Sequence, residues 1–504
     1  MSNPLYDELF APHAENKDAF IHDPLNKTSI SYADFISQST LLATTLQQFG
    51  LEAGDRLVAQ IGKSPQALML YAACVQSGIV FLPLNTAYTA NEVNYFVEDS
   101  GASLMVCSPE RKDELTIVAN THDVQLLTQS DDGESGTLID AVANCKNTFT
   151  PVNRQPDDIA ALLYTSGTTG RSKGAMLTQN NLLSNTKALV SLWQFTHKDV
   201  LLHALPVFHT HGLFVASNVA LFSKASIIFE AGFNLDRIIE RIPYATCLMG
   251  VPTFYTRLLS DERFDSSLTK NMRLFISGSA PLLAETHKQF EARTEHRILE
   301  RYGMTETNMN TSNPYDGDRR AGTVGMPLPG VEVKITHPDN GATLPANEIG
   351  VLEVRGPNVF SGYWNMPEKT AEELRENGFF ITGDLAVIDD DGYVTIVGRN
   401  KDLIISGGYN IYPKEIEQII DDQTGVLESA VIGVPHADFG ETVVAIVVAE
   451  NKDLNTDTVS EVVRGNLAKF KQPRKIIVVD ELPRNTMGKV QKNLLRDQYA
   501  NLFT

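Results

Sequence analysis

Residues 159–174 read IAALLYTSGTTGRSKG, an apolar run followed by hydroxyls, glycines and cations. The run from Ile159 to Tyr164 predicts a buried strand, and the loop after it predicts a phosphate site. Glycines let backbone N–H groups turn inward, hydroxyls add donors, and a lysine adds a positive charge that can follow a moving phosphate. The candidate phosphate ligands are Thr165, Ser166, Gly167, Thr168, Thr169, Gly170 and Lys173.

Two other interpretations of this loop are a Walker P-loop and an ordinary turn. The Walker spacing, Gly-x-x-x-x-Gly-Lys-Ser/Thr, cannot be laid over residues 167–174, so a P-loop is excluded. An ordinary Ser/Thr/Gly-rich turn stays open for the loop taken alone.

Length and charge narrow the class of protein. The chain has 504 residues, more than one hydrophobic core usually supports, so two or more domains are expected. Its 42% apolar and 21% charged residues are typical of a globular protein. Forty-two basic against sixty-two acidic residues give a net charge of −20, which argues against nucleic acid or an anionic membrane as the main partner.

Cysteine usage and the N-terminus predict the compartment. The four cysteines are far apart and show no Cys-x-x-Cys spacing: Cys74, Cys107, Cys145 and Cys247. The first residues include no basic segment followed by an apolar one, and no window reaches about 18 uninterrupted apolar residues. We therefore expect a cytoplasmic, unanchored protein, and the oligomeric state stays open.

The order of patterns along the chain predicts an α/β fold. Strand and helix patterns alternate through the first half, which favours layered sheets with parallel strands. Residues 128–156 are rich in Asp, Ser, Asn and Gly and predict a surface loop. From about Gly322, closely spaced prolines and glycines predict a smaller β-rich subdomain. We expect a large N-terminal domain over residues 1–400 and a small, mobile C-terminal α+β domain over residues 401–504.

Several later segments carry candidate chemistry. His209 and His211 could be metal ligands, but no Cys, Asp or Glu cluster completes a set, so pocket-lining side chains are preferred. Residues 274–281 form a strand that opens into small residues, a shape that accepts a flat ring or a phosphoester. Glu306 lies among hydroxyls and suits Mg²⁺, which takes only one or two protein ligands. Asp384, after Thr-Gly, could accept both hydrogen bonds of a ribose diol.

Five ordered motifs together resemble the adenylate-forming acyl-CoA synthetase superfamily, over nearly the whole chain. They are Thr165–Gly174, Tyr302–Glu306, Thr382–Asp384, Gly398–Asp402 and Pro483–Lys489. Within that superfamily, residues 209–212, 249–257 and 300–306 are similar to those of malonyl-CoA synthetases.

The resemblance implies a reaction in two steps. A carboxylate attacks the α-phosphorus of ATP and releases pyrophosphate; the CoA thiol then attacks the acyl-adenylate and releases AMP. ATP, Mg²⁺ and coenzyme A are therefore the expected cofactor and partners, beside the acid. The alternatives are a synthetase for another short or aryl acid, or a catalytically inactive nucleotide-binding protein. A kinase or an NTPase that forms ADP is disfavoured because its motifs are missing.

The resemblance also implies roles for single residues. Lys489 would bridge acid and phosphate in the first step, with Thr305 near the phosphates and Glu306 on Mg²⁺. The 165–173 loop would hold pyrophosphate, and Lys401 would be the hinge between the domains. The remaining ATP-binding residues would be Gly278, Ser279, Ala280, Tyr302, Asp384 and Arg399. The substrate-binding residues would be His209, Arg257, Ser277, Arg301 and Met304. Many relatives carry an aromatic residue where His209 stands.

Two arginines decide the expected acid. Arg257 and Arg301 fall in motifs that otherwise line an acyl site, and a buried arginine without an anion is costly. Either each has a protein carboxylate, such as Glu300 or Glu306 for Arg301, or the substrate brings one. The resemblance favours the second case, with malonate as the acid.

Overall fold

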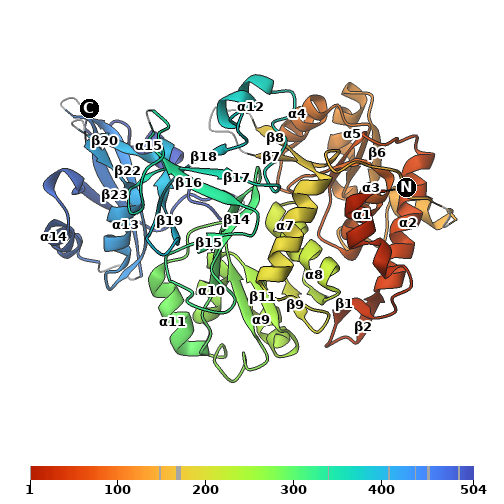
Figure 1. Cartoon of the computed structure of the whole chain (residues 1–504), viewed down its shortest axis with the longest axis horizontal. Helices are drawn as coiled ribbons and strands as arrows, with labels where there is room; N and C mark the ends of the chain where they lie inside the picture. Colours follow the sequence, from red (N-terminus) through yellow and green to blue (C-terminus); the bar gives the residue numbers. More distant parts are fainter. Residues whose placement is uncertain are drawn as a thin grey trace.

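Within the described residues, the strands form four sheets. The computed structural model describes residues 2–146, 149–165, 172–338, 340–406, 409–436, 439–450, 454–485 and 488–503. Three of the sheets lie before residue 400, and the fourth begins at Ile404. Figure 1 shows the last segment, in blue, as a separate lobe beside the larger body.

The phosphate-loop candidate lies at one edge of a six-stranded sheet of order β6-β5-β3-β4-β7-β8. Pairing is parallel from β6 to β7, as the alternation of patterns predicts, but β7 and β8 pair antiparallel and flank the loop directly. The strands are β3 (Arg56–Gln60), β4 (Val80–Pro83), β5 (Leu104–Cys107), β6 (Gln125–Thr128), β7 (Ile159–Thr165) and β8 (Lys173–Thr178).

The second sheet has nine strands in the order β15-β14-β13-β12-β11-β9-β10-β1-β2. Its central strands are parallel, while β13, β14 and β15 pair antiparallel at one end. The strands are β1 (Ala19–Asp23), β2 (Thr28–Ser31), β9 (Val200–His203), β10 (Ser226–Phe229), β11 (Cys247–Gly250), β12 (Leu274–Ser277), β13 (Leu299–Met304), β14 (Asn308–Ser312) and β15 (Met326–Pro327).

Helices pack beside these two sheets (Figure 1). Capping residues begin several of them: Ser31 accepts from the Asp34 amide, and Thr89 with Glu92 forms a capping box. The helices are α1 (Pro4–Leu9), α2 (Tyr32–Gln48), α3 (Pro65–Ser77), α4 (Ala90–Ser100), α5 (Lys112–Thr121), α6 (Thr137–Ala143), α7 (Gln179–Leu192), α8 (Asn218–Ser223), α9 (Leu235–Arg241), α10 (Pro252–Leu259), α11 (Ala284–Thr294) and α12 (Pro367–Glu373). Helix α6 lies where a surface loop was expected; Leu138 is its one buried residue.

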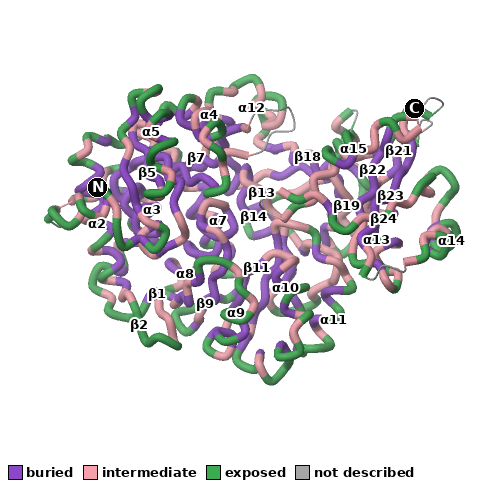
Figure 2. Tube along the Cα trace, turned by 180° about the vertical axis from the view of Figure 1, so that it is seen from behind, coloured by how far each residue is buried: buried purple, intermediate pink, exposed green. Residues whose placement is uncertain are grey.

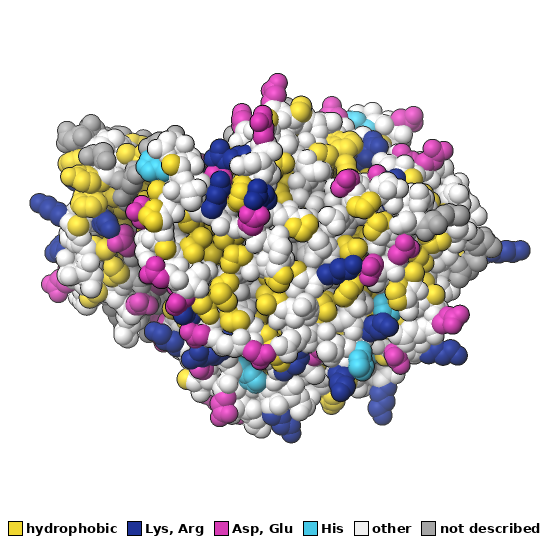
Figure 3. All heavy atoms as spheres, viewed as in Figure 1, with side chains coloured by type: hydrophobic (Ala, Val, Ile, Leu, Met, Phe, Trp, Pro, Cys, Tyr) yellow, Lys and Arg dark blue, Asp and Glu magenta, His cyan; other side chains and the backbone are white. Residues whose placement is uncertain are grey.

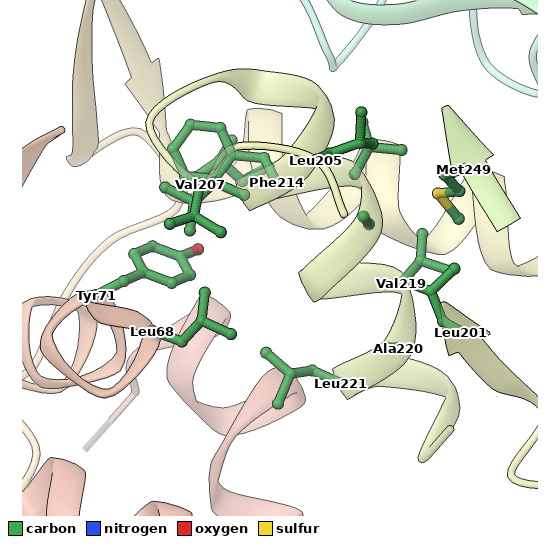
Figure 4. Close-up of a cluster of buried hydrophobic side chains, with 14 of the residues drawn as sticks. Leu68, Tyr71, Leu201, Leu205, Val207, Phe214, Val219, Ala220, Leu221 and Met249 are labelled. Carbon is green, nitrogen blue, oxygen red and sulfur yellow. The ribbon is translucent and has the colours of Figure 1, made fainter. Parts of the chain in front are cut away.

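The core between the two sheets supports the segment that carries the histidines. Figure 4 shows Tyr71 of α3 facing Val207 and Phe214, with Leu68 next to Tyr71 on the same helix. Leu205 lies further along. Phe214 belongs to a π-helical turn, His211–Ser217, which leads into α8. Because these side chains are almost fully buried, they fix the backbone on either side of His209 and His211.

The β-rich subdomain predicted after Gly322 is a four-stranded antiparallel sheet of order β16-β17-β18-β19. Its strands are β16 (Glu332–Thr336), β17 (Gly350–Arg355), β18 (Phe380–Ile388) and β19 (Val394–Arg399). The register places Asp384 directly opposite Arg399, which brings together two motifs that are separate in the sequence.

The C-terminal lobe has its own sheet and its own core. The described strands run β21-β20-β23-β22, with β24 parallel to β23. Figure 2 shows β22 and β23 buried inside this lobe, and its two apolar clusters are made only of residues after 403. The elements are β20 (Ile404–Ser406), β21 (Tyr409–Ile411), α13 (Pro413–Asp421), β22 (Val426–His436), β23 (Gly440–Ala449), α14 (Thr456–Asn466), β24 (Lys475–Val479) and α15 (Lys492–Tyr499).

The surface is mixed in charge. On the face drawn in Figure 3, acidic and basic side chains are interspersed. Among the residues that the structure describes, no helix combines the length and the apolar character needed to cross a bilayer.

Candidate active site

The candidate site forms where the ends of β12 and β13, the histidine segment and the Lys489 loop meet. The charges of Arg301 and Lys489 are both close enough to His209 to lower its pKa, after desolvation, to about 3. Arg399, Asp384, Glu306 and Arg301 in turn act on Lys489. The fold thus brings residues from four of the five motifs into one place.

Within the described part of the chain, Arg301 is a buried cation that forms no ion pair with a carboxylate. It is 3% exposed, and its Nε and Nη2 have no hydrogen-bond partner among the described residues. Desolvation lowers its pKa to about 9. The two acids considered as partners are engaged elsewhere: Glu300 with His287 Nδ1 at 3.4 Å, and Glu306 with the Tyr363 hydroxyl at 3.0 Å.

Further unsatisfied polar atoms belong to residues in or next to the segments that meet this guanidinium, Ser277 beside Gly278 and Thr210 beside His211. Ser277 Oγ, Thr210 Oγ1 and His211 Nε2 are buried and have no partner within the described part of the chain. The charge of Arg301 also helps burial to lower the pKa of His211. A buried polar atom that lacks a partner costs free energy, and a ligand with acceptor oxygens could pair with the donors of these segments and with the cation. We call Arg301, Ser277, Thr210 and His211 the 301 cluster.

Gly278 makes room for the 301 cluster. A Cβ added to this glycine would lie 2.3 Å from Arg301 Cζ and 2.5 Å from its Nε. The guanidinium therefore lies directly against the backbone at the end of β12. Ser279, the next residue, has a φ of +72° and its Oγ is 3.2 Å from His211 Nδ1. This hydrogen bond leaves His211 Nε2 as the free ring atom in the 301 cluster.

Arg257 does not share this environment. It is exposed on α10, and its guanidinium lies over the Phe233 ring, 5.8 Å from the centroid. The expectation that two arginines are buried against one acyl group is therefore corrected: water solvates Arg257, which needs no buried anion.

Asp384 and Arg399 form the next part of the site. Arg399 Nε is 2.7 Å from Asp384 Oδ1, and the Tyr302 hydroxyl donates to Asp384 Oδ2. Asp384 is 3% exposed, so these two donors hold its carboxylate in one orientation. The carboxylate of Asp384 raises the pKa of Arg399. Met304 lies on the same strand as Tyr302, with its Sδ 3.8 Å from the Tyr302 hydroxyl.

Glu306 fits a single-carboxylate Mg²⁺ site. It is 5% exposed, and desolvation raises its pKa, so a cation beside it would stabilise its charged form. No group of three or more His, Cys, Asp or Glu side chains converges anywhere in the described residues. Such sparse ligation suits Mg²⁺, which keeps several waters, and does not suit zinc. Thr305 lies in the turn just before Glu306 and is half-buried.

Lys173 is the described end of the phosphate-loop candidate. It is 8% exposed and sits in β8, opposite Thr165. Its Nζ is 3.3 Å from each carboxylate oxygen of Glu373 and 4.1 Å from the centroid of the Tyr363 ring. Ser166, Gly167, Thr168, Thr169 and Gly170 lie outside the described residues.

Sequence reasoning missed Tyr363 and Glu373. The Tyr363 hydroxyl lies 2.6 Å from Glu373 Oε2 and 3.0 Å from Glu306 Oε1. It therefore connects Glu373, the partner of Lys173, with Glu306, the candidate Mg²⁺ ligand. The sequence around Tyr363 and Glu373 contains no pattern that indicates a functional site. These two residues come close to Lys173 and Glu306 only in the folded chain.

Lys489 stands in a loop of the C-terminal lobe. The residue as a whole is exposed, but the surrounding groups desolvate its ammonium and, with Arg399, lower its pKa. Lys401 lies in a short 3₁₀ turn, Asn400–Asp402, between β19 and β20. Gly278 and Ala280 follow β12 in the same segment as Ser279.

Comparison with known proteins agrees with this arrangement. The "AMP-binding enzyme" family matches residues 9–364, and the "AMP-binding enzyme C-terminal domain" matches residues 415–489. A malonate–CoA ligase of Arabidopsis thaliana is 36% identical over 468 residues, which cover 84% of this chain and 75% of that protein.

Two crystal structures of MatB from Rhodopseudomonas palustris are similar over the full length of both chains. Both are 54% identical to this chain. The TM-score is 0.97 for the ATP-bound form and 0.87 for the apo form. The chain belongs to the AMP-binding enzyme family.

Proposed function

We propose that this chain ligates malonate to coenzyme A through a malonyl-adenylate. In the first step a carboxylate oxygen of malonate attacks the α-phosphorus of ATP, and pyrophosphate leaves. In the second, the CoA thiol attacks the acyl carbon, and AMP leaves with the bonding electron pair while the thiol loses its proton. Malonyl-CoA, AMP and pyrophosphate are the products.

The observation that carries the choice of malonate is the unpaired Arg301. A diacid can present one carboxylate to ATP and the other to a guanidinium, where two parallel N–H···O bonds hold it. Ser277 and His211 supply further donors, so the second carboxylate would satisfy the atoms that the protein leaves unpaired. A monocarboxylic acid would leave all of them buried without partners. The similarity to a malonate–CoA ligase supports the same choice.

His209 and Lys489 would act at the reacting carboxylate. Lys489 of the C-terminal lobe is close enough to His209 and Arg301 for their charges to interact, and its positive charge would meet the charge that develops between acid and α-phosphate. Burial keeps His209 neutral, so it can donate one hydrogen bond without adding a charge.

The remaining residues would bind ATP. Asp384, oriented by Tyr302 and Arg399, would accept from the ribose hydroxyls, and residues 278–280 would line the adenine. Lys173 and the loop before it would bind the leaving phosphates. Mg²⁺, held by Glu306, would neutralise phosphate charge when bound.

We further propose a domain boundary at residues 400/401, with Lys401 as the hinge. It is supported by the separate sheet and core after residue 403. A cytoplasmic location is proposed from the four thiols, none of which is in a disulfide among the described residues.

The test is a panel of acids supplied with ATP and CoA, scored for AMP and pyrophosphate. Malonate should be used best, methylmalonate less well, and acetate and longer diacids poorly. Formation of ADP would indicate a kinase, and absence of CoA-dependent AMP release would indicate an inactive nucleotide-binding protein. Efficient use of an aryl or another short monocarboxylic acid in preference to malonate would contradict the proposal.

Arg301→Ala tests whether the unpaired Arg301 binds the second carboxylate of malonate. Loss of a buried charge-assisted partner costs about 2–5 kcal/mol, so kcat/KM for malonate should fall by roughly 30-fold or more while acetate is much less affected. Arg263→Ala, which removes an exposed arginine paired with Asp236 and Asp261, is the matched control. Equal loss for malonate and acetate would mean that Arg301 is structural.

A further inference from the structure

The loop that carries Lys489 is closed by hydrogen bonds from residues just before it. Asn485 N donates to Lys489 O at 2.9 Å, and Lys489 N donates to Asn485 Oδ1 at 2.9 Å. Both backbone groups of Lys489 are therefore engaged. Gly488 has a φ of +75°, in the left-handed region that glycine adopts without strain, and this makes the turn possible.

One side chain ties this loop to the rest of the lobe. Arg484 Nη1 donates to Gly488 O at 2.6 Å, and Arg484 also pairs with Val490 through an isolated antiparallel bridge. Its Nη2 donates to a carboxylate oxygen of Glu428. A guanidinium is planar, so fixing one edge on a carboxylate orients the other edge toward the carbonyl.

Glu428 is a firm point of attachment. It belongs to β22, which pairs with β23 along most of its length, and it lies opposite Val448 in that register. Residues of β22 on either side of the sheet are in the two apolar clusters of the lobe. A continuous set of contacts thus leads from the sheet through Glu428 and Arg484 to the peptide that precedes Lys489.

Lys489 needs such a support because charges of both signs act on its ammonium. Arg399 and Arg301 repel it, Asp384 and Glu306 attract it, and the described part of the loop is partly exposed. A lysine has four flexible side-chain bonds, so its ammonium stays in place only if its backbone does. A displacement of about 1 Å in a reacting group can reduce a rate by roughly 100-fold.

We propose that Arg484 and Glu428 are positioning residues that hold the Lys489 loop for the adenylation step. This rests on the role proposed above for Lys489. Neither residue touches substrate in this proposal; each acts through the backbone of Gly488 and Lys489. They therefore matter for pyrophosphate release and not for thioester formation from a ready-made adenylate.

The test compares the two half-reactions in Glu428→Gln and Arg484→Lys. Glutamine keeps the size of the side chain but removes its charge, and lysine cannot contact both Glu428 and Gly488 O in a fixed plane. Pyrophosphate release should fall by about 10- to 100-fold, while thioester formation from supplied malonyl-adenylate should stay within about two-fold of wild type. Equal loss in both half-reactions, or no loss in either, would overturn the proposal.

Glu332→Gln is the matched control, since it breaks another Arg–Glu pair, with Arg355 at 2.6 Å, in the β-rich subdomain. It should leave both half-reactions unchanged. In a Lys489→Ala background, Glu428→Gln should cause no further loss of pyrophosphate release, because the group that it positions is gone. Independent, additive losses would show that Glu428 acts elsewhere.

Hydrogen exchange tests the support without any substrate. The amides of residues 485–490 should exchange faster in Glu428→Gln than in wild type, by about five-fold or more, with the β22 amides unchanged. Unchanged exchange in the loop would overturn the proposal even if the chain used another acid. If the wild-type enzyme does not use malonate, but the loop amides still exchange faster in Glu428→Gln than in wild type, only the proposed substrate is contradicted.

Discussion

The ammonium of Lys173 lies 3.3 Å from both carboxylate oxygens of Glu373, while the same carboxylate accepts from the Tyr363 hydroxyl. In the role proposed for it at the phosphates of ATP, Lys173 would have to leave this partner. Removing the acid in Glu373→Gln should therefore favour ATP binding. Because the pair is partly exposed, with side-chain exposures of 10% and 23%, the gain should be only about 1 kcal/mol, or roughly a three- to ten-fold lower KM for ATP.

Pyrophosphate release at varied ATP concentration measures this effect. Glu291→Gln is the control, since it breaks an exposed Arg–Glu pair, with Arg297 at 2.8 Å, that shares no residue with the Lys173–Glu373 pair. A higher KM in Glu373→Gln would mean that Glu373 holds Lys173 in its working position and does not compete with phosphate.

The Lys173–Glu373 pair also shows how far the sequence could predict this site. Lys173 is marked by its loop, but Glu373 lies 200 residues further along the chain, where α12 ends.

Helix starts at Ser31 and Thr89 were predictable because capping is local. Helix α6 was not predictable, because one buried leucine in seven residues does not show the repeat of apolar positions that is typical of a helix. Likewise Arg257 and Arg301 look alike in sequence, and only the fold separates the exposed one from the buried one.

Gly278→Ala should damage the use of malonate without damaging the fold. The added Cβ would come within 2.3–2.6 Å of three atoms of the Arg301 guanidinium, the flexible end of a long side chain. That end can move aside, so the melting temperature should change little. The guanidinium would no longer face the second carboxylate, and kcat/KM for malonate should fall by about ten-fold or more.

Gly232→Ala is the control for this substitution, since a Cβ there meets nothing within 4 Å. Thermal denaturation and malonate-dependent pyrophosphate release should be measured on both variants. If Gly278→Ala lowers the melting temperature and the activity in parallel, the glycine serves packing and not specificity.

Asp421 should make the C-terminal lobe less stable as the pH rises. Desolvation raises its pKa to about 7, although it accepts from Ser429 Oγ at 2.7 Å. The folded-state pKa thus lies above the unfolded value of about 4, so the contribution of Asp421 is complete below pH of about 4 and is lost as pH rises through about 7. The free energy of unfolding should fall on the order of 2 kcal/mol over that range.

Asp421→Asn should remove most of this pH dependence, because the amide has no charge to desolvate. Urea unfolding, monitored by hydrogen exchange of peptides from β22, would measure the pH dependence of stability in wild type and in Asp421→Asn at several pH values. The same slope in wild type and in Asp421→Asn would assign the pH dependence to other groups.

Lys401→Pro should separate the two half-reactions in the direction opposite to that of the Arg484 and Glu428 variants. Lys401 is the middle residue of the turn Asn400–Asp402, which joins β19 of the larger body to β20 of the lobe. In this structure the lobe holds Lys489 close enough to His209 and Arg301 for their charges to interact, as the proposed adenylation step requires. One small lobe cannot easily offer both Lys489 and a path for CoA to the same carbon, so a second arrangement is expected.

Proline fixes φ near −65°, a value compatible with a 3₁₀ turn, so the arrangement seen here should survive the substitution. Pyrophosphate release should then stay within about two-fold of wild type, while thioester formation from supplied malonyl-adenylate should fall by roughly ten-fold or more. Lys401→Ala, which keeps φ free, should retain both steps and so separates backbone restriction from loss of the side chain. Normal thioester formation by Lys401→Pro would show that the lobe turns about another residue, or that CoA reaches the adenylate without any turn.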